Sequence, residues 1–282
     1  MFYLIAAIFC STVISLSMRL SENYRKNHIS MLAVNYLTCL VLCIFYTGGG
    51  IFSAASNLTS PDYLYSLLLG AIQGFLYMVS FLLLQVNISR NGIVLSGTFM
   101  RLGLLVPTVC AILFFGEQPT TGHILGFILG ILAILLINLE KGERKVSSGF
   151  MLVLLLLGGG LVDVMAKIYE ETGSEGYKNE FLLFTFLVAL IICLVVTIIK
   201  KESLCPADIL WGIIIGIPNY YSARFLLGAL KTIPAIVVYP THSGATISLI
   251  TTAGVLFFKE TLSKRRIIAM GIIIAALLLL NQ

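Results

Sequence analysis

Apolar residues along this chain fall into ten long runs, each bounded by a short polar stretch. A helix needs roughly 20 apolar residues to cross the ~30 Å hydrocarbon core of a bilayer, and most of these runs are about that long. The pattern therefore predicts an all-α polytopic membrane protein. We expect ten transmembrane helices at about residues 2–20, 31–47, 62–86, 92–115, 121–138, 149–170, 180–199, 206–229, 234–258 and 265–281.

The composition indicates the same class. Hydrophobic residues make up 59% of the 282 residues and charged residues 11%, which is far too apolar for a soluble domain of this length. The first run starts at residue 2 without a basic leader or a small-residue cleavage site, so we expect a retained span rather than a cleaved signal peptide. Five of the six cysteines lie inside apolar runs without metal-ligand spacing, so we expect buried thiols and neither a metal nor a cofactor.

A repeated segment divides the chain into two halves. The run Leu113-Phe114-Phe115 returns as Leu256-Phe257-Phe258, and Glu117 returns as Glu260, at one fixed offset of 143 residues. A constant offset over such a run predicts an internal structural repeat. The predicted units are an N-terminal five-helix repeat at 1–140, a cytoplasmic linker at 141–148 and a C-terminal five-helix repeat at 149–282.

Loop charges predict the orientation of the chain. Five helices per half is an odd number, so the second half enters the membrane from the opposite side and the two repeats are inverted. Thirteen of the 18 Lys and Arg residues lie in or beside the loops after helices one, three, five, seven and nine, and the loop after helix six is acidic. Because basic loops stay in the cytoplasm, we expect both termini to be extracytoplasmic, in the cell (plasma or inner) membrane.

Small residues and prolines mark expected contacts and bends. Gly70-x3-Gly74 in helix three is answered by Gly212-x3-Gly216 in helix eight, and this spacing lets helices approach closely in lipid. We expect these contacts within one chain, so a monomer is favoured and a homodimer is the alternative. Bends near Pro107 and Pro240 are expected to bring helices four and nine together near the pseudo-two-fold axis.

The most specific motif runs from Pro107 through Phe114-Phe115-Gly116-Glu117 to Gly126. Ten helices in two inverted halves, each with a Glu that ends its fourth helix before a glycine-bearing fifth, resemble the EamA-type family of the drug/metabolite transporter superfamily. The second half departs from the motif at Lys259 and Ala269. The resemblance implies alternating-access transport through a site near mid-membrane, and EamA-type proteins often export small metabolites.

Helix one also resembles the small multidrug-resistance proteins, through Met18-Arg19. Those proteins place a membrane-buried Glu about two turns before this pair. This chain has Ser11 and Thr12 there, and the corresponding region of helix six offers Gly158 to Gly160. The missing carboxylate argues against a multidrug transporter of that kind.

Ionisable residues inside the predicted spans are the first candidates for a substrate site, because a charge at membrane depth must face protein or water. Arg101 lies near the middle of helix four, where its guanidinium cannot lose a proton or reach either surface. Asp163 and Lys167 lie one turn apart on helix six. The predicted substrate-binding residues are Arg101, Arg224, Asp163, His242, Tyr77, Thr98, Asn219, Tyr220, Tyr239 and Thr241.

Structural roles are the alternatives for these residues. Asp163 and Lys167 could neutralise each other as an i,i+4 pair, and Lys167 could extend to the outer surface. Asp163 could instead brace Arg101 or Arg224, and Arg101 could be structural for that reason. His242 could be a neutral hydrogen-bonding group rather than a titrating switch.

The sequence does not indicate an enzyme. It has no Gly-rich phosphate loop, no His-Glu-x-x-His and no Ser/His/Asp set with a common face, and its loops are too short for a nucleotide-hydrolysing domain. The net charge of +5 follows from the predicted topology, so no nucleic-acid partner is expected.

These patterns predict a secondary active transporter that exports small polar metabolites by alternating access. Arg101, Arg224 and Lys167 against Asp163 give a buried charge of about +2, which favours a carboxylate- or phosphate-bearing substrate. Because Asp163 could receive an ammonium group, amino acids or similar zwitterions are the first choice. An exporter of organic cations or drugs is the alternative, and a non-transporting scaffold or receptor is the second. The expected partners are the substrate, the lipid bilayer and a coupling proton or other ion.

Overall fold

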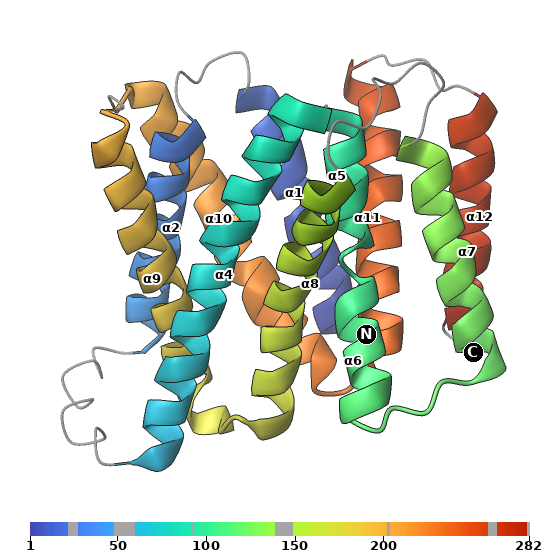
Figure 1. Ribbon diagram of the computed structural model, residues 1–282, viewed down its shortest axis with the longest axis horizontal. Coiled ribbons are helices and arrows are strands. Elements are labelled where there is room, and N and C mark those ends of the chain that lie inside the picture. Colours follow the sequence, from blue (N-terminus) through green and yellow to red (C-terminus); the bar gives the residue numbers. More distant parts are fainter. Residues whose placement is uncertain are drawn as a thin grey trace.

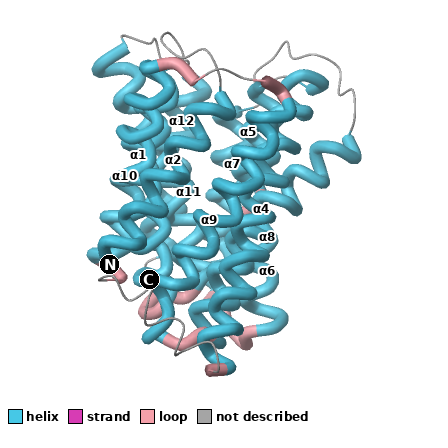
Figure 2. The backbone as a smooth tube through the Cα atoms, turned by 90° about the vertical axis from the view of Figure 1, so that its left-hand side faces the viewer, coloured by secondary structure: helices cyan, strands magenta, loops and turns pink. Residues whose placement is uncertain are grey.

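The computed structural model describes residues 1–21, 28–47, 60–91, 93–138, 149–201, 204–258 and 264–280. This part of the chain is helical almost throughout and contains no strand (Figure 2). The all-α fold predicted from the sequence is therefore confirmed. The predicted linker at 141–148 and the repeated Glu260 lie outside the described residues.

The long helices run between two opposite ends of the molecule, and successive spans alternate in direction (Figure 1). Within the described residues, each of the ten predicted spans is helical, nine as one helix and one as two. The elements are α1 (Phe2–Ser21), α2 (His28–Tyr46), α4 (Pro61–Asn91), α5 (Ile93–Leu102), α6 (Leu105–Phe114), α7 (Thr121–Asn138), α8 (Gly149–Thr172), the 3-10 turn η1 (Glu175–Tyr177), α9 (Lys178–Ile199), α10 (Pro206–Leu230), α11 (Ala235–Phe258) and α12 (Lys264–Leu280).

The predicted fourth helix is broken rather than bent, and α5 and α6 lie on either side of Gly103 and Leu104. Pro107 has no N–H, and its ring clashes with the carbonyl four residues earlier, at Gly103. The amides of Gly103 and Val106 donate to carbonyls three positions back, at 3.1 and 3.0 Å, so the chain turns more tightly there than an α-helix. By contrast, Pro240 lies inside one continuous helix, α11.

Glycines lie where helices approach most closely. A Cβ on Gly70 or Gly74 would lie 2.4 and 2.3 Å from main-chain oxygens of α9. A Cβ on Gly212 or Gly216 would lie 2.5 and 2.6 Å from side-chain carbons of α2. A Cβ on Gly160 of α8 would likewise crowd the break between α5 and α6. The predicted close contacts are therefore made within one chain.

Helices pack mainly across the two halves. α1 contacts α10 and α11, while α8, which is its counterpart in the second half, contacts α4 and both α5 and α6. Similarly, α2 packs against α10 while α9 packs against α4. These contacts recur with the two halves exchanged, which supports the two-fold relation between them. The division into two inverted repeats stays a proposal.

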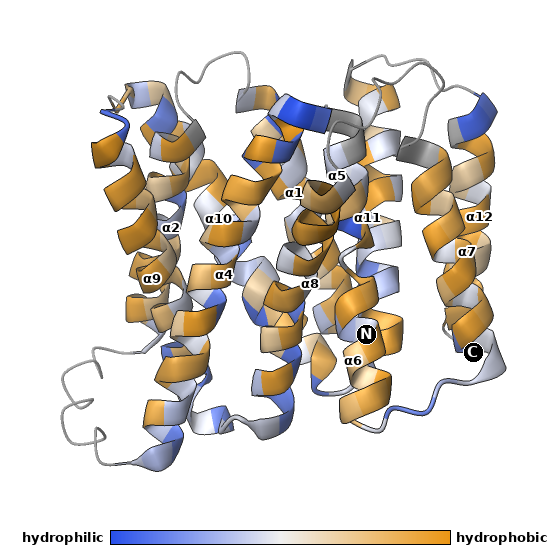
Figure 3. Ribbon diagram, in the orientation of Figure 1, coloured by the Kyte–Doolittle hydropathy of each residue, from blue (hydrophilic) through white to orange (hydrophobic). Residues whose placement is uncertain are grey.

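Hydrophilic residues gather toward the two ends of the molecule (Figure 3), and the charges at the two ends differ. The end at the top of Figure 1, here called the basic end, includes Arg19, Arg90 and Lys200 at the ends of α1, α4 and α9. The opposite end, here called the acidic end, includes Glu171 and Glu175, together with the start of α1 and the end of α12. The basic end is the predicted cytoplasmic side, and this orientation stays a prediction.

The helices are suited to a bilayer. Seven helical segments of the described chain are long and apolar enough to cross a membrane, and α7 and α12 are apolar but shorter. Large apolar side chains such as Phe45, Phe114 and Ile198 are more than 70% exposed, as a surface that faces lipid requires. The chain is therefore a multi-pass membrane protein.

Candidate substrate site

A cavity of about 380 Å³ lies between helices of both halves. This volume falls within the range of ~300–1,000 Å³ that small-molecule sites usually have. The cavity is lined from α1, α2, α4 and α5 of the first half and from α8 and α10 of the second. The sequence predicts a substrate site between the two halves, near mid-membrane, and this cavity is the candidate for that site.

The cavity extends from the middle of the molecule toward the basic end. Met18 and Leu32 line it near the basic ends of α1 and α2. Tyr77 and Asn219 line it near the middle of α4 and α10. Asp163 lies past the middle of α8, so it is on the side of the cavity nearest the acidic end.

Asp163 sets the electrostatics of the cavity. Among the described residues it is the one charged side chain in the lining, and no described residue gives its carboxylate a hydrogen bond or an ion pair. Its main-chain oxygen accepts a bond of 2.7 Å from the Tyr239 hydroxyl, which ties α8 to α11. The predicted site residues Asp163 and Tyr239 are therefore brought together.

The rest of the lining is aromatic and amide-bearing. Tyr36, Tyr77 and Phe81 line the cavity from α2 and α4. The Nδ2 of Asn219 donates to Oδ1 of Asn35 at 3.2 Å, which joins α10 to α2 across the two halves. The sequence pointed to Tyr77 and Asn219, whereas Phe81 and Met100 carried no polar signal that would have found them.

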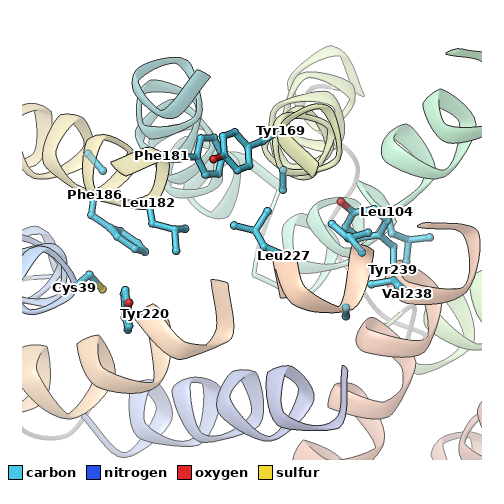
Figure 4. Close-up of a cluster of buried hydrophobic side chains, with 14 of the residues drawn as sticks. Cys39, Leu104, Tyr169, Phe181, Leu182, Phe186, Tyr220, Leu227, Val238 and Tyr239 are labelled. Atoms are coloured by element: carbon cyan, nitrogen blue, oxygen red, sulfur yellow. The ribbon is translucent and has the colours of Figure 1, made fainter. Parts of the chain in front are cut away.

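A second pocket lies on the acidic side of Asp163. It has a volume of about 20 Å³, enough for a water molecule, and Tyr77 and Asp163 line both this pocket and the larger cavity. The Thr185 hydroxyl donates to Gln73 Oε1 at 3.2 Å on its polar side. Leu182, Phe186 and Leu227 line its apolar side and belong to the buried cluster in Figure 4.

Lys167 does not pair with Asp163, contrary to the i,i+4 pairing considered from the sequence. Its Nζ lies 2.8 Å from Oε1 of Glu117 and 2.6 Å from Oε1 of Glu171, and the side chain is only 3% exposed. Glu117 also accepts main-chain hydrogen bonds from Ala235 at 2.8 Å and from Ile236 at 3.1 Å. It therefore caps the N-terminus of α11, where free N–H groups favour a carboxylate.

Arg224 lies outside the cavity, at the acidic end. Its Nη1 donates to Asn179 Oδ1 and to the Tyr220 hydroxyl, both at 2.7 Å. Its guanidinium lies 4.8 Å from the centre of the Tyr46 ring. Tyr46 and Tyr221 share a further hydrogen bond of 2.8 Å. Arg224 and Tyr220 thus belong to a closed cluster of polar and aromatic groups, and Asp163 does not brace Arg224.

His242 forms a separate network. Its Nε2 lies 2.9 Å from the Ser11 hydroxyl, which lies 2.7 Å from the Ser222 hydroxyl, so α1, α10 and α11 are joined. This arrangement agrees with a neutral hydrogen-bonding role. Thr241, the preceding residue, is buried, and its hydroxyl has no hydrogen-bond partner within the described part of the chain. Neither residue lines the cavity.

Arg101 and Thr98 lie on α5 and do not line the cavity, although Met100 between them does. Thr98 is fully buried. No described residue gives the Arg101 guanidinium a hydrogen bond or an ion pair, and so Asp163 does not brace Arg101. The structure therefore separates the predicted site residues into four groups: those at the cavity, those at the acidic end, those around α11 and the pair on α5.

The family assignment follows from the first half of the chain. A model of the EamA-like transporter family matches residues 1–139, which contain α1 to α7 and the Glu117 motif. The chain belongs to the EamA-like transporter family. The expected family is confirmed, and it is a family of membrane transporters. A model of the Small Multidrug Resistance proteins matches residues 180–273, from α9 into α12, rather than the helix-one segment that suggested the likeness.

Relatives of this EamA-like transporter match it over different lengths. An uncharacterised protein of Haemophilus influenzae is 26% identical over 93% of this chain and 91% of its own length. Multidrug resistance protein EbrB of Bacillus subtilis is 33% identical over 29% of this chain and 68% of its own length. A solved crystal structure of a protein covers 99% of this chain and 94% of its own, with a TM-score of 0.72 and 15% identity, which supports the fold alone.

Proposed function

We propose that this EamA-like transporter carries small organic molecules that bear an ammonium or other cationic group, with Asp163 as their counter-ion. The observation that supports this most is the lining of the cavity, in which Asp163 is the one charged side chain among the described residues. Arg101 and Arg224, which led the sequence analysis toward a carboxylate-bearing substrate, lie outside that lining. The geometry thus favours organic cations, the alternative substrate class predicted from the sequence, over amino acids and similar zwitterions, the first choice.

Electrostatics and ring chemistry favour the same ligand. A carboxylate at membrane depth is costly without a facing cation, and Asp163 has no such partner among the described residues. Tyr36, Tyr77 and Phe81 offer ring faces, which attract organic cations by roughly 0.5–2 kcal/mol each. One partial relative, EbrB, carries the name multidrug resistance protein.

The position of the cavity favours loading from the basic end. The acidic end is joined by contacts between helices, including the Glu117–Lys167 pair, the Arg224 cluster and the pair of Lys178 with Glu170 at 3.7 Å. If the basic end is cytoplasmic, the substrate enters from the cytoplasm, and alternating access releases it outside. We therefore propose export as the direction of transport.

Transport by purified protein in liposomes tests this function. The compounds are tetraphenylphosphonium as an organic cation, phenylalanine as a zwitterion and benzoate as an anion. We expect concentrative flux of the cation, strongly reduced by Asp163→Asn. The control is Ser80→Ala, which removes an uncharged hydroxyl of α4 from the cavity lining and should retain the flux. Flux of benzoate but not of the cation would overturn the proposal, and binding without flux would indicate a receptor.

The zwitterion reading remains as a second candidate because of one observation. The Arg101 guanidinium has no partner among the described residues, and its neighbour Met100 lines the cavity. A substrate carboxylate that reached Arg101 while its ammonium faced Asp163 would satisfy both groups. In that case Arg101→Ala should abolish phenylalanine flux and Arg101→Lys should restore little of it. Unchanged flux in Arg101→Ala would exclude this reading.

A further inference from the structure

Glu117 contacts two elements that both lead to Asp163. Lys167, its ion-pair partner, lies one turn beyond Asp163 on α8 and is directed to the same side of that helix. Ala235, whose amide donates to Glu117, lies one turn before Tyr239 on α11, and the Tyr239 hydroxyl donates to the main-chain oxygen of Asp163. One carboxylate thus joins the α6–α7 turn to the segments of α8 and α11 nearest Asp163.

We propose that Glu117 is a positioning residue for transport, a latch that holds the acidic side of Asp163 closed and must release when the site opens there. The proposal rests on the proposed function only in taking Asp163 as the group to which access alternates. Glu117 was singled out in the sequence by its repeat and its motif, and the cavity chemistry leaves it unused. Its contacts with α8 and α11 give it the role of a latch.

The latch lies on the one side of Asp163 that the cavity does not reach. The small pocket beyond Asp163 shares Tyr77 and Asp163 with the larger cavity, and Ala223 and apolar side chains of α9 and α10 line the side away from it. A route from Asp163 to the acidic end therefore requires the helices around this pocket to separate at the acidic end. Lys167 is only 3% exposed and Glu117 12% exposed, so water screens their attraction little.

Glu171 provides a matched control within the chain. It contacts the same Lys167 Nζ, at 2.6 Å, but it lies on α8 with Lys167 and is 42% exposed. Its loss removes a charge-assisted contact without freeing α8 from the α6–α7 turn or from α11. If the latch acts by joining elements, Glu117→Gln and Glu171→Gln must differ.

The experiment measures access to each side of Asp163 in a cysteine-free protein in nanodiscs, where both faces are open to reagent. One reporter is Ala223→Cys in the small pocket, and the other is Met100→Cys in the larger cavity. Each is labelled by a water-soluble maleimide without substrate. Because Glu117→Gln removes a charged partner of Lys167, we expect it to raise the labelling rate of Ala223→Cys about tenfold, which corresponds to about 1.4 kcal/mol, and to lower that of Met100→Cys. Glu171→Gln should leave both rates unchanged.

Reciprocal change distinguishes a latch from a merely structural group. If Glu117→Gln raises both rates, the carboxylate only stabilises the fold and the proposal fails. It also fails if neither rate changes, or if Glu171→Gln has the same effect. Should Glu117→Gln not fold, Lys167→Met breaks the same pair while leaving the α11 cap, and it must give the same reciprocal change. Binding of tetraphenylphosphonium is measured separately, so a failure at Asp163 is not confused with a failure of the latch.

Discussion

Gly160→Ala should destabilise this transporter, because α8 meets the break between α5 and α6 at this residue. An added Cβ would lie 2.5 Å from the Gly103 carbonyl oxygen and 2.5 Å from Cβ of Val106. Ordinary contacts lie at about 3.5–4 Å, so the helices must separate by roughly 1 Å. Overpacking of this kind costs about 1–3 kcal/mol, and the better helix propensity of Ala returns up to about 1 kcal/mol. We expect a net loss of about 2 kcal/mol.

Gly130→Ala is the matched control, because a Cβ on Gly130 of α7 meets nothing within 4 Å. It should be neutral or stabilise by up to about 1 kcal/mol. Thermal unfolding of both variants in the same detergent gives the comparison, and about 2–4 °C per kcal/mol places Gly160→Ala roughly 4–12 °C below the control. Equal melting temperatures would show that the break does not pack on α8 as described.

Three further outcomes follow from individual contacts. Arg224→Ala should lower the free energy of unfolding by about 2–4 kcal/mol, because it removes two charge-assisted bonds and the stacking on Tyr46. It should leave the cation preference of transport unchanged. Melting measurements check the first part and flux measurements the second. Thr241→Val should change stability by less than about 1 kcal/mol in the same melting assay, because the buried hydroxyl has no partner to lose among the residues that the structure describes. Cys205, near the basic end of α10, should resist an impermeant maleimide applied to intact cells when it is the one cysteine retained, and labelling from outside would reverse the proposed orientation.

The helices could be predicted closely from the sequence because apolar run length is a local property. Most predicted boundaries agree with the structure to within three residues, and α4 extends five residues further, to Asn91. The break at Gly103 was not predicted, because Pro107 alone allows either a bend or an interruption. Close packing of Gly160 against Gly103 distinguishes the two outcomes, and that contact joins distant parts of the chain.

The candidate site could be predicted only in part, because the rotation of each helix about its axis decides which polar residues meet. Asp163, Tyr77 and Asn219 do line the cavity. Lys167 and Arg224 are directed to partners at the acidic end, and local spacing on their own helices gave no sign of Glu117 or Asn179. The constant offset between Glu117 and Glu260 marked Glu117 as notable, but only its contacts with α8 and α11 indicate its role.

A binding cycle in nanodiscs tests the central claim most directly. The affinities of a primary amine and of the alcohol that replaces its ammonium by hydroxyl are measured by calorimetry on the native protein and on Asp163→Asn. We predict that the amine loses at least about tenfold, or 1.4 kcal/mol, more affinity than the alcohol on this substitution. Equal losses for the two ligands would show that Asp163 shapes the cavity without binding the cation, and would contradict the proposed function.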